Sequence, residues 1–184
     1  CGSCDSVFVC RADIPGLCSE GAIDLGIPGS DLVEGTAPGL TTRLRLGIGK
    51  CRLALCVPED ASIESAAALS GSRIATSFPN VTKRYLDNLC IEAHMVPLSG
   101  SVEIMVSLGV ADAIVDLVET GSTLAANRLQ ILDEIGTYET VVVQHAGQRQ
   151  SELANRILRR LEGVVIARGY SLLEYNVPRK RLNE

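Results

Sequence analysis

The stretch ADAIVDLVETGSTL, residues 111–124, joins a strand, a turn and the start of a helix. Residues 113–118 form a continuous apolar run that only Asp116 interrupts, which is typical of a strand buried on both faces. Residues 119–123 then supply a glycine and three hydroxyls at the start of a predicted helix, residues 122–129. In an open α/β sheet, ligands bind beyond the carboxyl ends of the strands, so this turn is the first place to look for a site.

The turn has the features of a phosphate-binding loop. Gly121 permits a tight turn and the close approach of a ligand, and the first amides of the following helix carry unpaired donors. The hydroxyls of Thr120, Ser122 and Thr123 surround these amides, so a phosphate can be held without a lysine. Asp116, on the preceding strand, is available to accept hydrogen bonds from sugar hydroxyls. The pattern predicts a sugar-phosphate site; a helix start that binds nothing is the alternative on the turn alone.

Strands and helices alternate along the whole chain. The strands predicted from apolar, β-rich runs besides residues 113–118 are 6–10, 22–27, 51–57, 73–76, 91–96, 140–144 and 171–177. The predicted helices besides 122–129 are a short one after Asp13 and those over 62–69, 80–89, from Ser101, and over 148–168, while 29–40 is predicted as a loop. Strands separated by helices predict βαβ units and therefore an α/β fold with mostly parallel sheets.

The composition limits the classes of function. Hydrophobic residues make up 46% of the 184 and charged residues 21%, as in an ordinary globular α/β protein. With no Trp, two Phe and four Tyr, the chain has few rings on which single-stranded nucleic acid could stack. The net charge of −5 argues against binding a phosphate backbone. We expect no nucleic-acid partner and, because no apolar run has the length of a bilayer span, no membrane.

The seven cysteines form no recognisable metal or disulfide set. Their odd number and wide spacing do not resemble a secreted disulfide framework. Cys1 and Cys4 have CxxC spacing, but no second such pair and no close pair of histidines completes a zinc site. We therefore expect no metal ligands among the cysteines, which act as small hydrophobic residues in the reducing cytoplasm.

Six motifs follow one another in the order found in one enzyme family. They are RADIPGL (11–17), GAIDLGI (21–27), GKCRLAL (49–55), RIATSFPNVTKRYLD (73–87), SGSVE (99–103) and DAIVDLVETGSTLAANRL (112–129). Together they resemble ATP phosphoribosyltransferase, the first enzyme of histidine biosynthesis, over nearly the whole chain. The resemblance implies two α/β lobes with a cleft between them, as in type II periplasmic binding proteins. Lobe one is expected over 1–55 plus 129–184 and lobe two over 56–128.

The resemblance also implies a reaction. N1 of the adenine of ATP joins C1 of the ribose of phosphoribosyl pyrophosphate, and pyrophosphate leaves with the assistance of Mg²⁺. The departing group carries a large negative charge and the ribosyl centre becomes cation-like. Catalysis is therefore expected from positioning, metal neutralisation and electrostatic preorganisation rather than from a covalent nucleophile.

The site residues follow from the same resemblance. The implied ligands of phosphoribosyl pyrophosphate are Asp112, Asp116, Thr120, Gly121, Ser122, Thr123 and Leu124. The implied ATP contacts are Asp13, Tyr85 and Glu103, and the implied catalytic residues are Glu103 and Asp116. For Tyr85, a half-buried helix aromatic without a ligand is an equally good interpretation.

The sequence departs from the family pattern in several places. No K-G-R motif precedes Cys1, and the ending YNVPRKRL (175–182) resembles the segment before a regulatory domain, so we expect a chain without both parts. Pro28 and Gly47 replace a small hydroxyl and an acidic residue. A catalytically impaired homologue or regulatory subunit, or a non-enzymatic two-lobed solute-binding protein, are therefore the alternatives. We expect a homo-oligomer, a dimer or larger.

Overall fold

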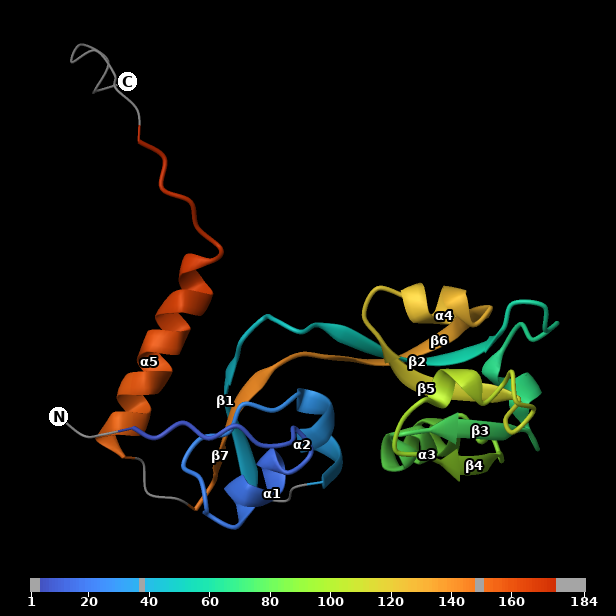
Figure 1. Ribbon diagram of the computed structural model, residues 1–184, viewed down its shortest axis with the longest axis horizontal. Coiled ribbons are helices and arrows are strands. Elements are labelled where there is room, and N and C mark those ends of the chain that lie inside the picture. Colours follow the sequence, from blue (N-terminus) through green and yellow to red (C-terminus); the bar gives the residue numbers. More distant parts are fainter. Residues whose placement is uncertain (1–3, 37–38, 148–150, 175–184) are drawn as a thin grey trace.

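The strands of the protein form two separate sheets. The computed structural model describes residues 4–36, 39–147 and 151–174. The smaller sheet pairs β1 (Leu40–Arg45) with β7 (Val141–His145), and the larger has the strand order β4-β3-β5-β2-β6. Figure 1 shows each sheet with its own helices, and two ribbons joining them, one from β1 to β2 and one from β6 to β7. The expected α/β, two-lobed architecture is confirmed.

The larger sheet is mixed rather than mostly parallel. Strand β3 (Arg73–Thr76) runs parallel to both β4 (His94–Pro97) and β5 (Ala113–Val118). Strand β2 (Cys51–Pro58) runs antiparallel to β5 and to β6 (Leu129–Tyr138). The expectation of mostly parallel sheets is corrected here, because β2 enters this lobe from the edge toward which β5 runs, and β6 returns to that same edge.

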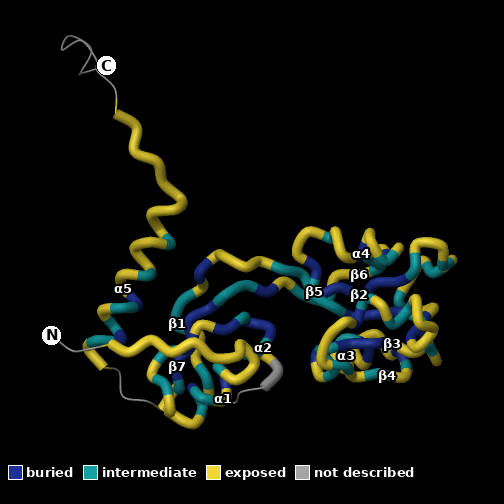
Figure 2. Tube along the Cα trace, viewed as in Figure 1, coloured by how far each residue is buried: buried dark blue, intermediate teal, exposed yellow. Residues whose placement is uncertain are grey.

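Both faces of the larger sheet are covered, which explains the unbroken apolar runs of β2 and β5. On one face, Leu53, Leu55 and Val57 pack with residues of α3 (Pro79–Asn88). On the other, Ala54 and Cys56 pack with Val102 of the 3₁₀ helix η2 (Val102–Ile104) and with Leu124 of α4 (Ser122–Ala126). Figure 2 shows these central strands as the buried part of the lobe.

Several elements match the sequence prediction. The predicted strands at 51–57, 73–76, 113–118 and 140–144 correspond to β2, β3, β5 and β7, and the strand at 91–96 is the shorter β4. Among the helices, α1 (Ile14–Ser19) follows Asp13 as predicted, and α5 (Glu152–Ala167) begins after Ser151. Residues 148–150, predicted as the beginning of α5, lie outside the described residues. The helix predicted at 62–69 is only a 3₁₀ turn, η1 (Ala66–Leu69), and that predicted from Ser101 is η2.

Other predicted elements are wrong. Residues 6–10 are irregular and exposed, and residues 22–27 contribute one isolated bridge, from Gly26 to Val143. The predicted loop at 29–40 contains α2 (Ser30–Thr36), and β1 and β6 were not predicted. Residues 171–174 form no strand, and the rest of that predicted strand lies outside the described residues.

The predicted lobe boundaries stay a prediction. The boundary at 55/56 falls inside β2, and the one at 128/129 falls directly before β6. Both strands pair along their length within the larger sheet. Within the described residues, no helix is long and apolar enough to cross a membrane.

Candidate functional site

The candidate site lies along the edge of the larger sheet that faces the smaller one. Because β3, β4 and β5 are parallel, the segments that follow them reach the same edge. Strand β2 begins at this edge and β6 ends there, since Cys51 pairs with Tyr138 and Arg52 with Val118. The connections to β1 and β7 leave from this edge (Figure 1), so the segments that follow β3, β4 and β5 lie where the two lobes meet.

The loop after β5 has the geometry of a shallow, hydroxyl-lined turn. Gly121 has a φ of 79°, in the left-handed region, and is the N-cap of α4. The Thr120 and Ser122 hydroxyl oxygens lie 3.0 Å apart, and both side chains, like that of Thr123, are exposed. Leu124 is different, because its side chain is buried in the core and anchors α4. Only the backbone of Leu124 is therefore suited to face a ligand.

Asp116 lies on β5 directly before this loop and is half-buried. Its Oδ1 accepts a hydrogen bond from the Leu117 N–H at 2.8 Å. Burial is the largest influence on the Asp116 pKa and raises it, and the nearby charge of Glu103 raises it further. The Leu117 N–H and the positive charge of Arg11 act in the opposite direction. The structure therefore brings Asp116 and Glu103 together, with a cation from the other lobe in range of Asp116.

Glu103 is positioned by an unusual backbone. It belongs to η2, whose N-cap Ser101 has a φ of 53° although it is not a glycine. A left-handed conformation at such a residue is uncommon and concentrates at functional sites. Ser101 comes from the SGSVE segment, which follows β4 and approaches the same edge as the loop after β5.

Four residues near this edge were not assigned by the sequence analysis: Arg11, Asp31, Cys51 and Glu119. Arg11, in the turn before α1, acts electrostatically on both Asp116 and Cys51. Burial raises the pKa of the Cys51 thiol most, and the charges of Asp31 and Glu119 raise it further. Three of the quoted motifs contain a missed residue: RADIPGL begins at Arg11, GKCRLAL contains Cys51 and DAIVDLVETGSTLAANRL contains Glu119. Asp13, which also belongs to RADIPGL, is exposed at the start of α1, and its side chain makes no capping hydrogen bond.

Asp112 is not brought to this edge. It precedes β5, at the opposite end of the strand from Thr120. Its carboxylate accepts three hydrogen bonds from Arg73, at 2.8, 3.2 and 2.8 Å from the backbone N, Nε and Nη2. These hydrogen bonds lower the Asp112 pKa. The geometry gives Asp112 a bracing role between β3 and β5.

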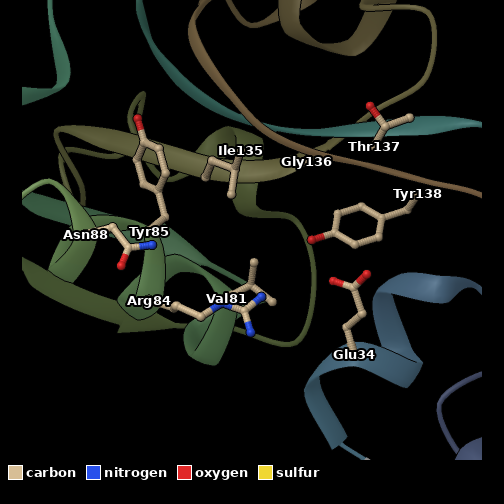
Figure 3. Close-up of a pocket in the computed structure, with 9 residues that line it drawn as sticks. All are labelled: Glu34, Val81, Arg84, Tyr85, Asn88, Ile135, Gly136, Thr137 and Tyr138. Atoms are coloured by element: carbon tan, nitrogen blue, oxygen red, sulfur yellow. The ribbon is translucent and has the colours of Figure 1, made fainter.

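A pocket of about 310 Å³ opens beside the same edge, between the two lobes. Its lining residues come from α2, α3 and β6 and are Glu34, Val81, Arg84, Tyr85, Asn88, Ile135, Gly136, Thr137 and Tyr138. In Figure 3 the Glu34 carboxylate points toward the Tyr138 hydroxyl, and the Arg84 guanidinium lies beside Val81, to one side of both. The Tyr85 hydroxyl donates a hydrogen bond to Asp133 Oδ2. The pocket thus offers two aromatic rings and charges of both signs.

The pocket and the loop after β5 lie on either side of Cys51. Tyr138 is paired with Cys51 on β6, while the register of β2 with β5 brings Glu119 next to Cys51 on the other side. Neighbouring strands lie about 4.8 Å apart, so Tyr138 and Glu119 are separated by about 10 Å. This distance allows one ligand, or two reacting ligands, to reach both places.

No metal site is formed by the protein alone in the described part of the chain. Within it, no group of three or more His, Cys, Asp or Glu side chains could hold a metal ion. The six cysteines described there, Cys4, Cys10, Cys18, Cys51, Cys56 and Cys90, are free thiols. Burial raises the pKa of the Cys56 thiol to about 12, with the charge of Asp116 as the second cause. This makes Cys56 a poor nucleophile and a poor metal ligand.

The fold defines a class of two-lobed α/β architectures. The substrate binding protein of an amino acid ABC transporter superposes with a TM-score of 0.61 at 16% identity, covering 86% of this chain and 71% of that one. The GluR0 ligand binding core superposes with a TM-score of 0.58 at 12% identity, covering 84% and 72%. At this identity the likeness concerns the fold alone.

Sequence similarity is more specific than the fold. The model of the family described as HisG: ATP phosphoribosyltransferase matches residues 11–163. An ATP phosphoribosyltransferase of Rhodopirellula baltica is 61% identical over 98% of this chain, and one of Methanopyrus kandleri is 40% identical over 97%. A HisG:HisZ complex of Thermotoga maritima contains a chain that superposes with a TM-score of 0.77 at 34% identity, covering 86% of this chain and 78% of that one. The chain belongs to the ATP phosphoribosyltransferase family. It spans 60% and 63% of the length of the two relatives.

Proposed function

We propose that this chain carries the substrate cleft of an ATP phosphoribosyltransferase, the first enzyme of histidine biosynthesis. In the reaction, a bond forms between N1 of the adenine and C1 of the ribose. The bond from C1 to the pyrophosphate oxygen breaks, and the electron pair leaves with pyrophosphate. The observation that carries the proposal is the juxtaposition of the exposed hydroxyl loop after β5 with the half-buried Asp116.

The loop is assigned to the 5-phosphate of phosphoribosyl pyrophosphate. The exposed hydroxyls of Thr120, Ser122 and Thr123 and the left-handed Gly121 support this assignment. The backbone N–H groups of the first turn of α4, which includes Leu124, add donors to the same place. Asp116 is assigned to the ribose hydroxyls, because it is the third residue from the end of β5 and faces the same side of the sheet as α4.

Glu103 and Asp116 are assigned to the reacting centre. The charge of Glu103 acts on Asp116, which fits a site where a cation-like ribosyl centre forms between two carboxylates. Arg11 is the counter-charge on the side of lobe one. Asp112 is left out of the proposed site, because Arg73 already engages both of its oxygens.

ATP is assigned to the pocket between the lobes. The Tyr85 and Tyr138 rings, Arg84 and Asn88 line it and offer stacking, a positive charge and hydrogen bonds. Asp13 and Glu103 do not line this pocket, and they are assigned to the part of the cleft where the adenine meets the ribose. These assignments place ATP on one side of Cys51 and the ribose phosphate on the other.

Mg²⁺ fits this set of residues only as an ion shared with substrate. Mg²⁺ is commonly held by one or two carboxylates together with substrate phosphates, and Asp116 and Glu103 are the paired carboxylates of the cleft. When bound, the ion would neutralise charge on the departing pyrophosphate.

The proposal also covers the oligomeric state and the cellular location of the enzyme. A homo-oligomer is favoured by exposed apolar side chains, among them Val7, Phe8, Leu172 and Leu173. A cytoplasmic location is favoured by the free thiols of the described residues.

The direct test is a turnover assay with ATP, phosphoribosyl pyrophosphate and Mg²⁺, following phosphoribosyl-ATP and pyrophosphate together. We expect equal amounts of both products, and none when Mg²⁺ is chelated. Thr120→Ala should raise the KM for phosphoribosyl pyrophosphate about tenfold, the effect of a lost phosphate hydrogen bond, whereas Thr137→Ala, at the pocket, should leave it unchanged. Tight binding of phosphoribosyl pyrophosphate without turnover would favour an impaired homologue. Absence of both binding and turnover would refute the proposal.

A further inference from the structure

Tyr85 is held at its hydroxyl by a residue of another element. The chain has only two Phe and four Tyr, and two of these six rings, Tyr85 and Tyr138, line the pocket between the lobes. The Tyr85 hydroxyl is 2.5 Å from Asp133 Oδ2, and the ring packs against the core formed by α3 and the sheet. In Figure 3 this hydroxyl points away from Glu34 and Arg84, so the ring, rather than the hydroxyl, faces the pocket.

Two β-bulges in β6 set the direction of Asp133. Consecutive residues of β2 skip a residue of β6 at two places. Leu53 pairs with Gly136 but Ala54 with Glu134, and Leu55 pairs with Asp133 but Cys56 with Ile131. Ile135 and Leu132 are therefore the extra residues of two bulges, and both pack on the α3 side of the sheet. Bulges of this kind re-aim neighbouring side chains and are frequent next to functional sites. Here Asp133 pairs with Leu55 and its carboxylate reaches α3.

The Asp133 carboxylate is itself fixed. Its Oδ1 accepts a hydrogen bond from the Glu134 N–H at 2.9 Å, which leaves Oδ2 for the Tyr85 hydroxyl. The next side chain, Glu134, points to the other face, where it pairs with Arg52. The bulged segment thus divides two adjacent carboxylates between the two faces of the sheet.

The second ring of the pocket also depends on the bulged segment. A Cβ at Gly136 would lie only 3.1 Å from the Tyr138 hydroxyl and 3.3 Å from its ring. The absence of a side chain at Gly136 therefore lets the Tyr138 ring lie close against the β6 backbone. Residues 133–136 consequently set the position of both rings.

We propose that Asp133 is a positioning residue, which holds the Tyr85 ring as a preformed wall of the pocket for a planar heterocycle. This inference rests on the proposed function, in which the heterocycle is the adenine of ATP. A ring already fixed in its bound rotamer loses less conformational freedom when a ligand stacks on it, so the tether favours binding without touching the ligand.

The test compares Asp133→Asn with the matched variant Asp87→Asn. Asp87 is an exposed carboxylate of α3 that pairs with Lys83 and lies outside the pocket lining. Asp133→Asn should raise the KM for ATP by roughly three- to tenfold, with kcat and the KM for phosphoribosyl pyrophosphate within about twofold. Asp87→Asn should change none of them. In the Tyr85→Phe background, Asp133→Asn should have no further effect on the KM for ATP, since the tether is already gone.

A second readout separates failure of this inference from failure of the proposed function. Burial raises the pKa of Tyr85 most, and the Asp133 carboxylate raises it further. Asp133→Asn should therefore lower the pKa of one tyrosine in a spectroscopic titration of tyrosinate, with or without turnover. If wild type neither turns over nor binds ATP, the proposed function fails, and the inference fails with it. A different result is that the wild type is active and Asp133→Asn lowers the tyrosine pKa but leaves the KM for ATP unchanged. Asp133 would then have a structural role only, and the inference would be overturned. Equal rises in both KM values would also overturn the inference.

Discussion

At the scale of single residues, the cleft combines groups that lower the stability of the folded protein when no ligand is bound. Asp116 is a half-buried carboxylate near a second carboxylate, Glu103, and no salt bridge within the described residues involves it. Ser101 has a left-handed backbone conformation that only Gly adopts without strain. Such features are expected where a site is preorganised for a ligand.

Replacing Asp116 by Asn should stabilise the ligand-free protein at neutral pH. Because the folded-state pKa of Asp116 is raised, its contribution to stability is present below the unfolded pKa and is lost as the pH rises through the folded pKa. Above that pH the ionised side chain disfavours folding, and Asn removes this term. We expect a gain of about 1 kcal/mol, or roughly 2–4 °C in Tm, at pH 7. The difference should shrink in acid, and a less stable variant at pH 7 would contradict the argument.

Gly121 and Gly163 form a matched pair for backbone strain. A Cβ meets nothing within 4 Å at either position, but only Gly121 has a left-handed φ. Gly121→Ala should therefore destabilise the protein by about 1–2 kcal/mol, whereas Gly163→Ala, inside α5, should stabilise that helix by about 0.5–1 kcal/mol. Chemical denaturation measures both. If both variants changed the free energy of unfolding in the same direction, the turn after β5 would not depend on the left-handed conformation of Gly121.

At the scale of elements, the strands most readily predicted from the sequence are those that are buried on both faces. Strands β2 and β5 are buried on both faces and are visible as apolar runs. Strand β6 lies at the edge of its sheet, is partly exposed and contains Gly136 and acidic residues, so its pattern is ambiguous. Residues 6–10 show the reverse error, because Phe8 is 98% exposed and a β-rich run without a partner strand in the described residues forms no sheet.

Helix α5 supplies a prediction at this scale. The Ser151 hydroxyl accepts a hydrogen bond from the Ala154 N–H at 3.0 Å and caps the helix. Ser151→Ala should cost about 1 kcal/mol of helix stability, and Ser151→Asp should retain most of the cap. Because α5 is largely exposed, the effect should appear first as faster hydrogen exchange of the amides in its first turn. Unchanged exchange would mean that packing on β1, rather than the cap, holds the helix.

At the scale of the whole molecule, the part of the site within one motif was predictable and the rest was not. Residues 112–124 are contiguous, so the hydroxyl loop and Asp116 could be identified together. Cys51 reaches this edge through the pairing of β2 with β5 and β6. Arg11 and Glu34 come from distant segments of the other lobe, and they reach it only because the two lobes face each other. The same folding separates Asp112 from the loop, although both belong to one motif.

The central claim is that phosphoribosyl pyrophosphate binds at the edge where β5 ends and not where it begins. Calorimetric titration of phosphoribosyl pyrophosphate with Mg²⁺ into wild type, Asp116→Asn and Asp112→Asn tests it directly. Loss of a charged hydrogen bond to the ribose should weaken binding about tenfold or more in Asp116→Asn, while Asp112→Asn should stay within about twofold of wild type. Equal affinities for wild type and Asp116→Asn, or a large loss confined to Asp112→Asn, would contradict the claim.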